Sequence, residues 1–211
     1  MKISPSILDA NFACLQSEID SIATADRIHL DVMDGQYVPN LSFGGPVLKG
    51  LNYPVETEAH LMVNDPENFF DMFIGVGCKT ITFHIENTGR ARALQLLMQL
   101  QSKGVKAGIC VDGYTDVDFL DDEILKVADQ VLLMSVKAGF GGQSFMPEVI
   151  EKIKSLRARG YEGEIEVDGG VVLDNVGLLK EAGADIVVSG SFIMKKPEAE
   201  RAEIIKAFQA V

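Results

Sequence analysis

Short apolar runs rich in β-branched residues alternate along the chain with segments in which apolar residues recur every three or four positions. The first pattern predicts buried β-strands and the second predicts amphipathic helices. The expected strands cover Lys2–Leu8, Arg27–Met33, Val55–Met62, Thr80–His84, Val105–Val111, Gln130–Met134, Glu164–Val167 and Ile186–Ser189. The expected helices cover Phe12–Thr24, Pro46–Leu51, Pro66–Val76, Arg90–Lys103, Val117–Val127, Pro147–Arg159, Asp174–Ala182 and Glu198–Ala210.

Strands that alternate with helices imply parallel strands joined by right-handed crossovers. Eight such units close naturally into a (β/α)8 TIM barrel, and the chain length of 211 residues suits that fold. A doubly wound open sheet is the main alternative. Because no linker-like or low-complexity stretch divides the chain, we expect a single barrel domain over residues 1–211.

Composition limits the classes of partner. The net charge of −12 argues against nucleic acid, although a pocket can still be locally positive and accept an anionic small molecule. The apolar runs are too short to cross a membrane, and the N-terminus lacks a long apolar signal segment, so we expect a cytoplasmic protein without a membrane partner. The three cysteines are scattered and are expected to be free thiols.

Polar side chains occur where several expected strands end, which is where a barrel of this kind places its chemistry. His29 and Asp31 share one strand face because they are two residues apart. Together with His60 and Asp168 they offer two imidazoles and two carboxylates, which suit Zn²⁺ and also Mn²⁺, Fe²⁺ or Co²⁺. A lone histidine is more often a core residue, and His84 is expected to line the pocket without binding metal.

Glycine-rich segments follow the last three expected strands and predict an anion site. They are Gly139-Phe140-Gly141-Gly142, Asp168-Gly169-Gly170 and Gly190-Ser191. Glycine lets backbone N–H groups approach a phosphate closely, and loops after the last barrel strands often form such a site. Ser191 is a possible cap for a short helix at 192–194. The alternative is that these glycines only turn the chain.

Three methionines stand at strand ends, and they are Met33, Met62 and Met134. Core packing is their usual role. Around a metal they could also exclude water and so strengthen local electrostatic interactions.

Several ordered segments resemble the ribulose-phosphate 3-epimerase family. The resemblance runs from Ser4 to about Ser191, and its segments are Pro5-Ser6-Ile7-Leu8, residues 29–35, Val38-Pro39-Asn40, His60-Leu61-Met62, Met134-Ser135-Val136, residues 139–145, residues 166–170 and Gly190-Ser191. The resemblance implies a metal-dependent enzyme that inverts C3 of a ketose phosphate, most simply D-ribulose 5-phosphate to D-xylulose 5-phosphate. It also implies association into a homo-oligomer.

The resemblance assigns roles to individual residues. It implies one divalent metal, with zinc as the first expectation, held by His29, Asp31, His60 and Asp168. Asp31 and Asp168 would also transfer the proton through a metal-stabilised enediolate, so one of them needs a raised pKa. The substrate would contact Ser6, His60, Gly139, Phe140, Gly141, Gly142, Asp168, Gly169, Gly170, Gly190 and Ser191.

This chain departs from the family pattern at three loops, namely at Gln36-Tyr37, Asp112-Gly113 and Lys137-Ala138. The departures leave the sugar open, and a 3-epimerase acting on allulose 6-phosphate is the nearest alternative. Lys137 could reach the phosphate or a distal hydroxyl, or could be a solvated loop residue. Two further classes are a phosphosugar keto-acid decarboxylase and a non-catalytic phosphosugar-binding barrel. The decarboxylases use an Asp-x-Lys-x-x-Asp pattern, which Asp31-Val32-Met33-Asp34 lacks.

Overall fold

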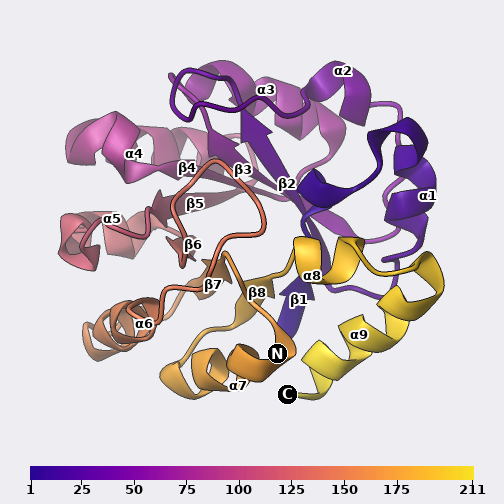
Figure 1. The fold of residues 1–211 in the computed structure, drawn as a ribbon. Helices are drawn as coiled ribbons and strands as arrows, with labels where there is room; N and C mark the ends of the chain where they lie inside the picture. Colours follow the sequence, from indigo (N-terminus) through magenta and orange to yellow (C-terminus); the bar gives the residue numbers. More distant parts are fainter.

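Eight parallel strands surround a common axis in the computed structural model, which describes residues 1–211 (Figure 1). The strands are hydrogen-bonded in the order β1-β8-β7-β6-β5-β4-β3-β2, so each lies beside its neighbour in the chain except where β1 meets β8. Their bounds are β1 (Lys2–Ser4), β2 (Arg27–Met33), β3 (Glu56–Met62), β4 (Thr80–His84), β5 (Lys106–Val111), β6 (Gln130–Met134), β7 (Glu164–Asp168) and β8 (Ile186–Val188).

Helices form a ring outside the strands (Figure 1). Their bounds are α1 (Leu15–Asp20), α2 (Gly45–Leu48), α3 (Glu67–Val76), α4 (Ile85–Ser102), α5 (Asp122–Val127), α6 (Val149–Ala158), α7 (Leu173–Ala182), α8 (Ser191–Met194) and α9 (Glu198–Ala210). Three 3₁₀ helices, η1 (Ile7–Asp9), η2 (Phe12–Cys14) and η3 (Val117–Phe119), precede α1 and α5. None of the helices combines the length and the apolar character needed to span a bilayer.

The barrel closes between β1 and β2. The His29 backbone N–H donates to the Pro5 carbonyl at 3.0 Å, and Ser6 and His29 form a parallel bridge. Because both edges of the sheet meet in this way, the structure confirms the predicted (β/α)8 barrel and excludes the open doubly wound sheet.

The first strand is much shorter than predicted. It ends at Ser4, whereas the sequence pattern extended it to Leu8. Pro5 has no N–H to donate to a neighbouring strand, and the Ser6 hydroxyl accepts a hydrogen bond from the Leu8 N–H at 3.2 Å. The chain therefore turns into η1, and Ser6 is positioned by a helix cap.

Several helix predictions also need correction. The segments predicted at 12–24 and 117–127 each contain a 3₁₀ helix followed by a short α-helix, and α2 ends at Leu48 instead of Leu51. Helix α4 begins at Ile85, five residues before the predicted start, and is interrupted by Gly89 with a φ of 66°. The extra turn before Gly89 carries Glu86, which lies near the predicted site. The segment 198–210 is helical as predicted.

The hydrophobic core lies between the strands and the helices. On β2, Ile28, Leu30 and Val32 are buried members of a single cluster of 49 residues that continues around the barrel. Alternate residues of the same strand point to the barrel axis, because successive side chains of a strand face opposite ways. The apolar runs in the sequence therefore mark the outer faces of the strands.

The barrel interior is polar at its lower level, near the start of the strands. Arg27 donates to Glu58 at 2.8 Å, to Gln130 at 2.9 Å and to Glu164 at 3.0 Å, so one guanidinium joins β2, β3, β6 and β7. Gln130 in turn donates to Glu166 at 2.6 Å. Barrel interiors are usually filled by Val, Ile and Leu. Here a hydrogen-bonded layer of charged and amide groups supports the level above it.

Gly169 follows β7 where the chain passes against β6 and its loop. Its φ is +119°, which residues with a side chain rarely adopt, and a Cβ added there would lie 2.5 Å from Val136 Cγ2. A glycine at this position is therefore needed for both conformation and space. Gly177 in α7 differs, because nothing lies within 4 Å of its ideal Cβ position.

Replacing Arg27 with Met should destabilise the protein by about 3–5 kcal/mol, because the change leaves Glu58 and its partners buried without their cation. Lys106→Met is the matched control, since this half-exposed lysine contacts the same Glu164 at 3.3 Å. It should cost at most about 1 kcal/mol. Urea unfolding of the two variants gives the comparison, and equal losses would contradict the role assigned to Arg27.

Gly169→Ala should lower the free energy of unfolding by about 1–3 kcal/mol, because the new methyl group collides with Val136 in a strained backbone. Gly177→Ala, within a helix and with free space, should instead raise it by about 0.4–1 kcal/mol. Both are measured by denaturant titration, and the opposite order would show that Gly169 is not constrained as described.

Candidate active site

Four predicted residues meet at the upper level of the barrel interior. His29 and Asp31 come from β2, His60 from β3 and Asp168 from β7. Each contributes one nitrogen or carboxylate oxygen, and these atoms all lie within 4.8 Å of one another. The register places Asp31 directly opposite His60 on the neighbouring strand. The juxtaposition expected from strand alternation is therefore present in the structure.

His29 presents a free nitrogen to this group. Its Nδ1 lies 3.0 Å from Glu58 Oε1, and Glu58 also accepts hydrogen bonds from Ser4 and Arg27. Its Nε2 is buried without a hydrogen-bond partner and lies 3.4 Å from Asp31 Oδ1. Burial opposes a charge on this ring, but Asp31 and Glu58 raise the pKa of His29 well above its usual range. A proton or a metal cation is therefore stabilised at Nε2.

His60 is fully buried and turns its Nδ1 towards the carboxylates. The Nδ1 atom lies 3.1 Å from Asp31 Oδ1 and 3.7 Å from Asp168 Oδ2. Burial and the neighbouring His84 lower the pKa of His60 to about 4, although Asp31 opposes this change. The ring is thus neutral near pH 7 and can offer a nitrogen lone pair.

The two aspartates have opposite shifts in pKa. Burial alone would raise the pKa of Asp31, but His29 and His60 hold it well below its usual range. The Ser6 hydroxyl also donates to Asp31 Oδ2 at 2.5 Å. For Asp168, burial and the nearby Asp31 charge raise the pKa to about 7. One carboxylate is therefore ionised while the other is poised to hold a proton, which is the arrangement expected of a base and an acid.

This donor set fits a divalent transition metal. Two imidazole nitrogens and two carboxylate oxygens match the ligands that zinc and neighbouring metals use in proteins. The unpartnered, buried Nε2 of His29 is explained if a cation occupies the space beside it. The hydrogen bond from its other ring nitrogen to Glu58 is the support that metal-bound histidines commonly have.

Two further clusters share residues with this group. The first is His60, His84 and Cys110, and the second is His29, Glu58 and Glu166. Burial raises the pKa of the Cys110 thiol well above its usual range, so this sulfur stays protonated and is a poor ligand. Burial and the neighbouring Glu58 likewise raise the pKa of Glu166. Both clusters are therefore better described as surroundings of the four-residue group.

A cavity of about 500 Å³, including solvent at its mouth, opens above the site. Asp31 and Asp168 reach its wall, whereas His29 and His60 are not among its lining residues. The lining residues are Ser6, Leu8, Asp9, Asp31, Met33, Met62, Met134, Val136, Gly139, Phe140, Gly141, Gly142, Gln143, Asp168, Gly169, Gly170, Val188, Gly190 and Ser191. The three strand-end methionines thus surround the carboxylates with apolar, water-excluding groups.

His84 does not line this cavity, in contrast to the prediction. It is buried, and its Nε2 lies 2.9 Å from Nε2 of His60, with the ring centroids 5.0 Å apart. The prediction failed because it treated the end of β4 as part of the cavity wall, whereas His60 lies in front of His84.

The three predicted glycine segments come together along one side of the cavity. The backbone N–H groups of Gly141, Gly142 and Gly170 make no hydrogen bond within the chain, so they are free to bind an anion. The predicted short helix is present as α8, but Gly190 and not Ser191 occupies its cap position, without a side-chain hydrogen bond. Ser191 is the first residue of the helix, so its side chain does not cap the turn.

The sequence patterns missed several residues that contact or support the site. Asp9 lines the cavity beside Gly141 and lies 3.6 Å from Lys195 Nζ. Glu58 and Glu166 lie beneath the site and stand two residues before His60 and Asp168 on the same strand faces. That spacing was a usable signal, because any residue two positions before an inward-facing ligand also faces the barrel axis.

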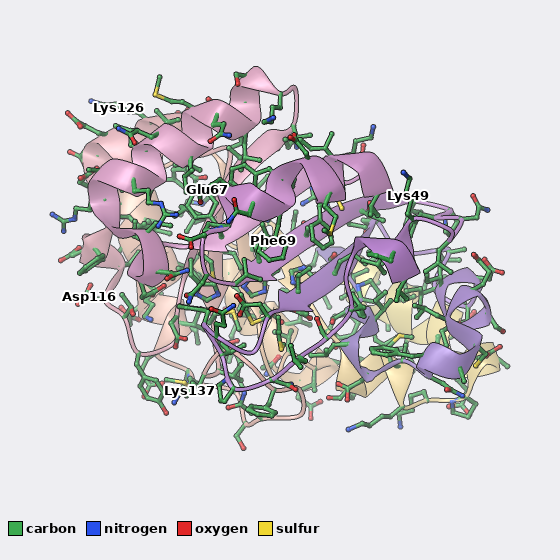
Figure 2. All side chains as sticks on the ribbon, turned by 90° about the horizontal axis from the view of Figure 1, so that it is seen from above. Lys49, Glu67, Phe69, Asp116, Lys126 and Lys137 are labelled. Carbon is green, nitrogen blue, oxygen red and sulfur yellow. The ribbon has the colours of Figure 1, made fainter.

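The loops that depart from the family pattern lie outside the cavity wall. Gln36 is exposed, and Asp112 accepts a hydrogen bond from the Ala138 N–H at 3.3 Å. Lys137 is exposed on the loop after β6, and Figure 2 shows it among the outer loops. Lys137 stands two residues before Gly139, which lines the cavity.

Comparison with known proteins gives consistent results. The model of the ribulose-phosphate 3-epimerase family matches residues 2–194. A ribulose-phosphate 3-epimerase of Escherichia coli strain K12 is 41% identical over 209 residues, covering 94% of this chain and 91% of the relative. A ribulose-phosphate 3-epimerase of Synechocystis sp. is 40% identical over 203 residues, covering 92% of this chain and 88% of the relative. A cytoplasmic isoform of ribulose-phosphate 3-epimerase from Oryza sativa subsp. japonica is 37% identical over 214 residues, covering 99% of this chain and 92% of the relative.

Solved structures support the fold independently. A 3-hexulose-6-phosphate synthase superposes with a TM-score of 0.74 at 16% identity, covering 100% of this chain and 99% of the other. An N-(5'-phosphoribosyl)anthranilate isomerase from Pyrococcus furiosus gives a TM-score of 0.69 at 17% identity, covering 100% of both chains. At such identities the likeness concerns the barrel alone. The family match and the relatives near 40% identity show that the chain belongs to the ribulose-phosphate 3-epimerase family.

Proposed function

We propose that this protein is a metal-dependent epimerase that inverts C3 of a ketose phosphate and interconverts D-ribulose 5-phosphate and D-xylulose 5-phosphate. The observation that carries the proposal is the convergence of His29, Asp31, His60 and Asp168 in one small volume, with the carboxylates of Asp31 and Asp168 in the wall of one cavity. Relatives that bear this enzyme's name are about 40% identical over most of the chain.

His29, Asp31, His60 and Asp168 would hold the metal, with zinc as our first assignment and iron, manganese or cobalt as alternatives. When bound, the metal would supply positive charge beside the substrate oxygens on which negative charge develops. The support is the mixed nitrogen and oxygen donor set and the unpartnered Nε2 of His29.

Asp31 and Asp168 would move the proton. Removing a proton from C3 and returning one on the opposite side requires a base and an acid that approach from different directions. The two side chains come from β2 and β7, which are separated in the barrel by β1 and β8. In the metal-free protein His29 and His60 lower the pKa of Asp31, whereas burial and Asp31 raise the pKa of Asp168 to about 7. We therefore assign Asp31 as the initial base for one direction of the reaction and Asp168 as the acid.

The phosphate would bind the glycine segments at the other end of the cavity. Free backbone N–H groups at Gly141, Gly142 and Gly170 support this placement, together with the neighbouring Gly139, Phe140, Gly169, Gly190 and Ser191. Ser6 lies in the cavity wall with its hydroxyl on Asp31, where it can both orient that carboxylate and contact the sugar. The methionines would limit the access of water to the reacting carbon.

The relatives named ribulose-phosphate 3-epimerase favour a pentulose over a ketohexose as the substrate. Gln36, Asp112 and Lys137, the residues that left the sugar open, do not line the cavity. We therefore expect the lining to recognise the family's pentulose phosphate.

Asp31→Asn and Asp168→Asn should each lower kcat by at least about a thousandfold, because general acid–base catalysis alone contributes about 10²–10⁴-fold and the metal set is also impaired. Each should also abolish inversion at C3, although the remaining carboxylate can still exchange the proton on its own side of the substrate. Asp174→Asn, at the first turn of α7 and outside the cavity, is the control. Formation of the C3 epimer measures inversion and loss of deuterium from labelled substrate measures exchange. Near-normal inversion by either site variant would refute the two-carboxylate mechanism.

Metal-reconstituted enzyme should show a higher kcat/KM for D-ribulose 5-phosphate than for allulose 6-phosphate, by at least about tenfold. The hexulose has one additional carbon with its hydroxyl, which must fit the same cavity lining. One extra group of this size changes specificity by roughly 10–200-fold. Side-by-side kinetics decide the question. A preference for the hexulose would show that the departing loops, and not the lining, set the substrate.

A further inference from the structure

His84 contacts a metal-site histidine without belonging to the four-residue group. Its ring is buried and lies nearly parallel to that of His60, with an interplanar angle of 19°, and the two rings meet through their Nε2 atoms, which are 2.9 Å apart. At that distance one nitrogen donates a proton and the other accepts it. The direction of this hydrogen bond fixes the tautomers of both rings.

The site decides the direction. Since Nδ1 of His60 faces the carboxylates of Asp31 and Asp168, this is the nitrogen that would bind the metal. A nitrogen that binds a metal carries no proton, so the single proton of a neutral imidazole lies on the other nitrogen. His60 Nε2 must then donate to His84 Nε2.

The same reasoning continues outward from His84. A neutral His84 that accepts at Nε2 carries its proton on Nδ1, and this atom lies 3.2 Å from Glu86 Oε2. Burial opposes ionisation of Glu86, but hydrogen bonds from His84 and the Asp112 N–H lower its pKa, so it is a carboxylate acceptor. In this series of hydrogen bonds, from His60 through His84 to Glu86, every donor therefore faces an acceptor.

Glu86 is itself held on both sides. The Asp112 backbone N–H donates to its Oε1 at 2.7 Å, and the Tyr37 hydroxyl lies 3.5 Å from its Oε2. The Tyr37 ring also packs on His84 with centroids 4.9 Å apart. Through the Tyr37 ring and the Asp112 backbone, two of the loops that depart from the family pattern contact His84 and Glu86.

We propose that Glu86 and His84 are positioning residues that hold His60 in the tautomer and orientation with a free Nδ1, and so strengthen metal binding. The proposal rests on the metal site described under the proposed function. Partners of this kind, one shell outside the metal ligands, typically change metal affinity by about 10–100-fold. Glu58 does the same for His29, so each histidine would have its own carboxylate support.

The test compares His84→Phe with His84→Gln. Phe keeps a ring between His60 and Tyr37 but removes the acceptor, whereas Gln can offer its amide oxygen to His60 Nε2. Zn²⁺ binding to metal-free protein is measured by competition with a chelator of known affinity. We expect His84→Phe to bind Zn²⁺ about 10–100-fold more weakly than the unaltered protein, and His84→Gln to recover most of that loss.

Thermal unfolding of the metal-free proteins separates positioning from packing. If both variants lose metal affinity equally and lose thermal stability to the same extent, His84 has only a packing role and the proposal fails. It fails also if His84→Phe binds Zn²⁺ within threefold of the unaltered protein. Absence of one tightly bound Zn²⁺ in the unaltered protein would instead refute the metal site itself, so the two failures are distinguishable.

Glu86→Gln gives a second measurement that leaves the His84 ring and its contacts with His60 and Tyr37 in place. Removing the charge from the acceptor should weaken Zn²⁺ binding by about tenfold. Tyr37→Phe is the matched control, because it keeps the ring on His84 and deletes only the hydroxyl 3.5 Å from Glu86. The Tyr37→Phe variant should bind Zn²⁺ with an affinity within twofold of that of the unaltered protein. If Glu86→Gln also stays within twofold, the proposal is wrong even where His84→Phe does not fold.

Discussion

Glu58 accepts hydrogen bonds from Arg27, Ser4 and His29 at the centre of the barrel, and the rest of the structure depends on this buried carboxylate being fully partnered. Burial alone would raise the pKa of Glu58, but His29 and Arg27 hold it well below its usual range. An unpaired charge in this position would be strongly destabilising. The same contacts orient His29 so that its other nitrogen faces the candidate metal site.

The two levels of the barrel interior thus have different roles, because the lower level supports the structure and the upper level forms the candidate site. The lower level, built from Arg27, Gln130 and the glutamates, joins four strands by hydrogen bonds and leaves little freedom to the level above. The upper level places two histidines and two aspartates in one small volume. Most of the buried apolar surface lies outside the barrel, where the apolar strand faces meet the helices, and a smaller cluster of eight residues includes the three strand-end methionines beside the site. This separation lets the interior be polar without loss of a hydrophobic core.

Much of the fold and part of the site follow from local rules. The alternation of apolar runs and helical periodicity predicts the bounds of β2, β4 and β6 without error, because each is a fully buried strand between clear turns. It overextends β1, because Pro5 and the Ser6 cap act against an apolar pattern that continues to Leu8. Strand alternation also identifies His29 and Asp31 as partners, since residues two apart share a face. The family resemblance adds their expected roles.

By itself, the sequence determined the barrel class, because eight strand patterns alternate with helix patterns along the chain. It also determined the four candidate ligands and the three glycine segments, because each stands at or near the end of an expected strand. Only the tertiary structure decided which nitrogen of each histidine faces the site, and that Glu58, Glu86 and His84 support those rings. It also decided that Asp31 and Asp168 differ in pKa. These properties depend on burial and on distances between strands far apart in the chain, which no local pattern contains.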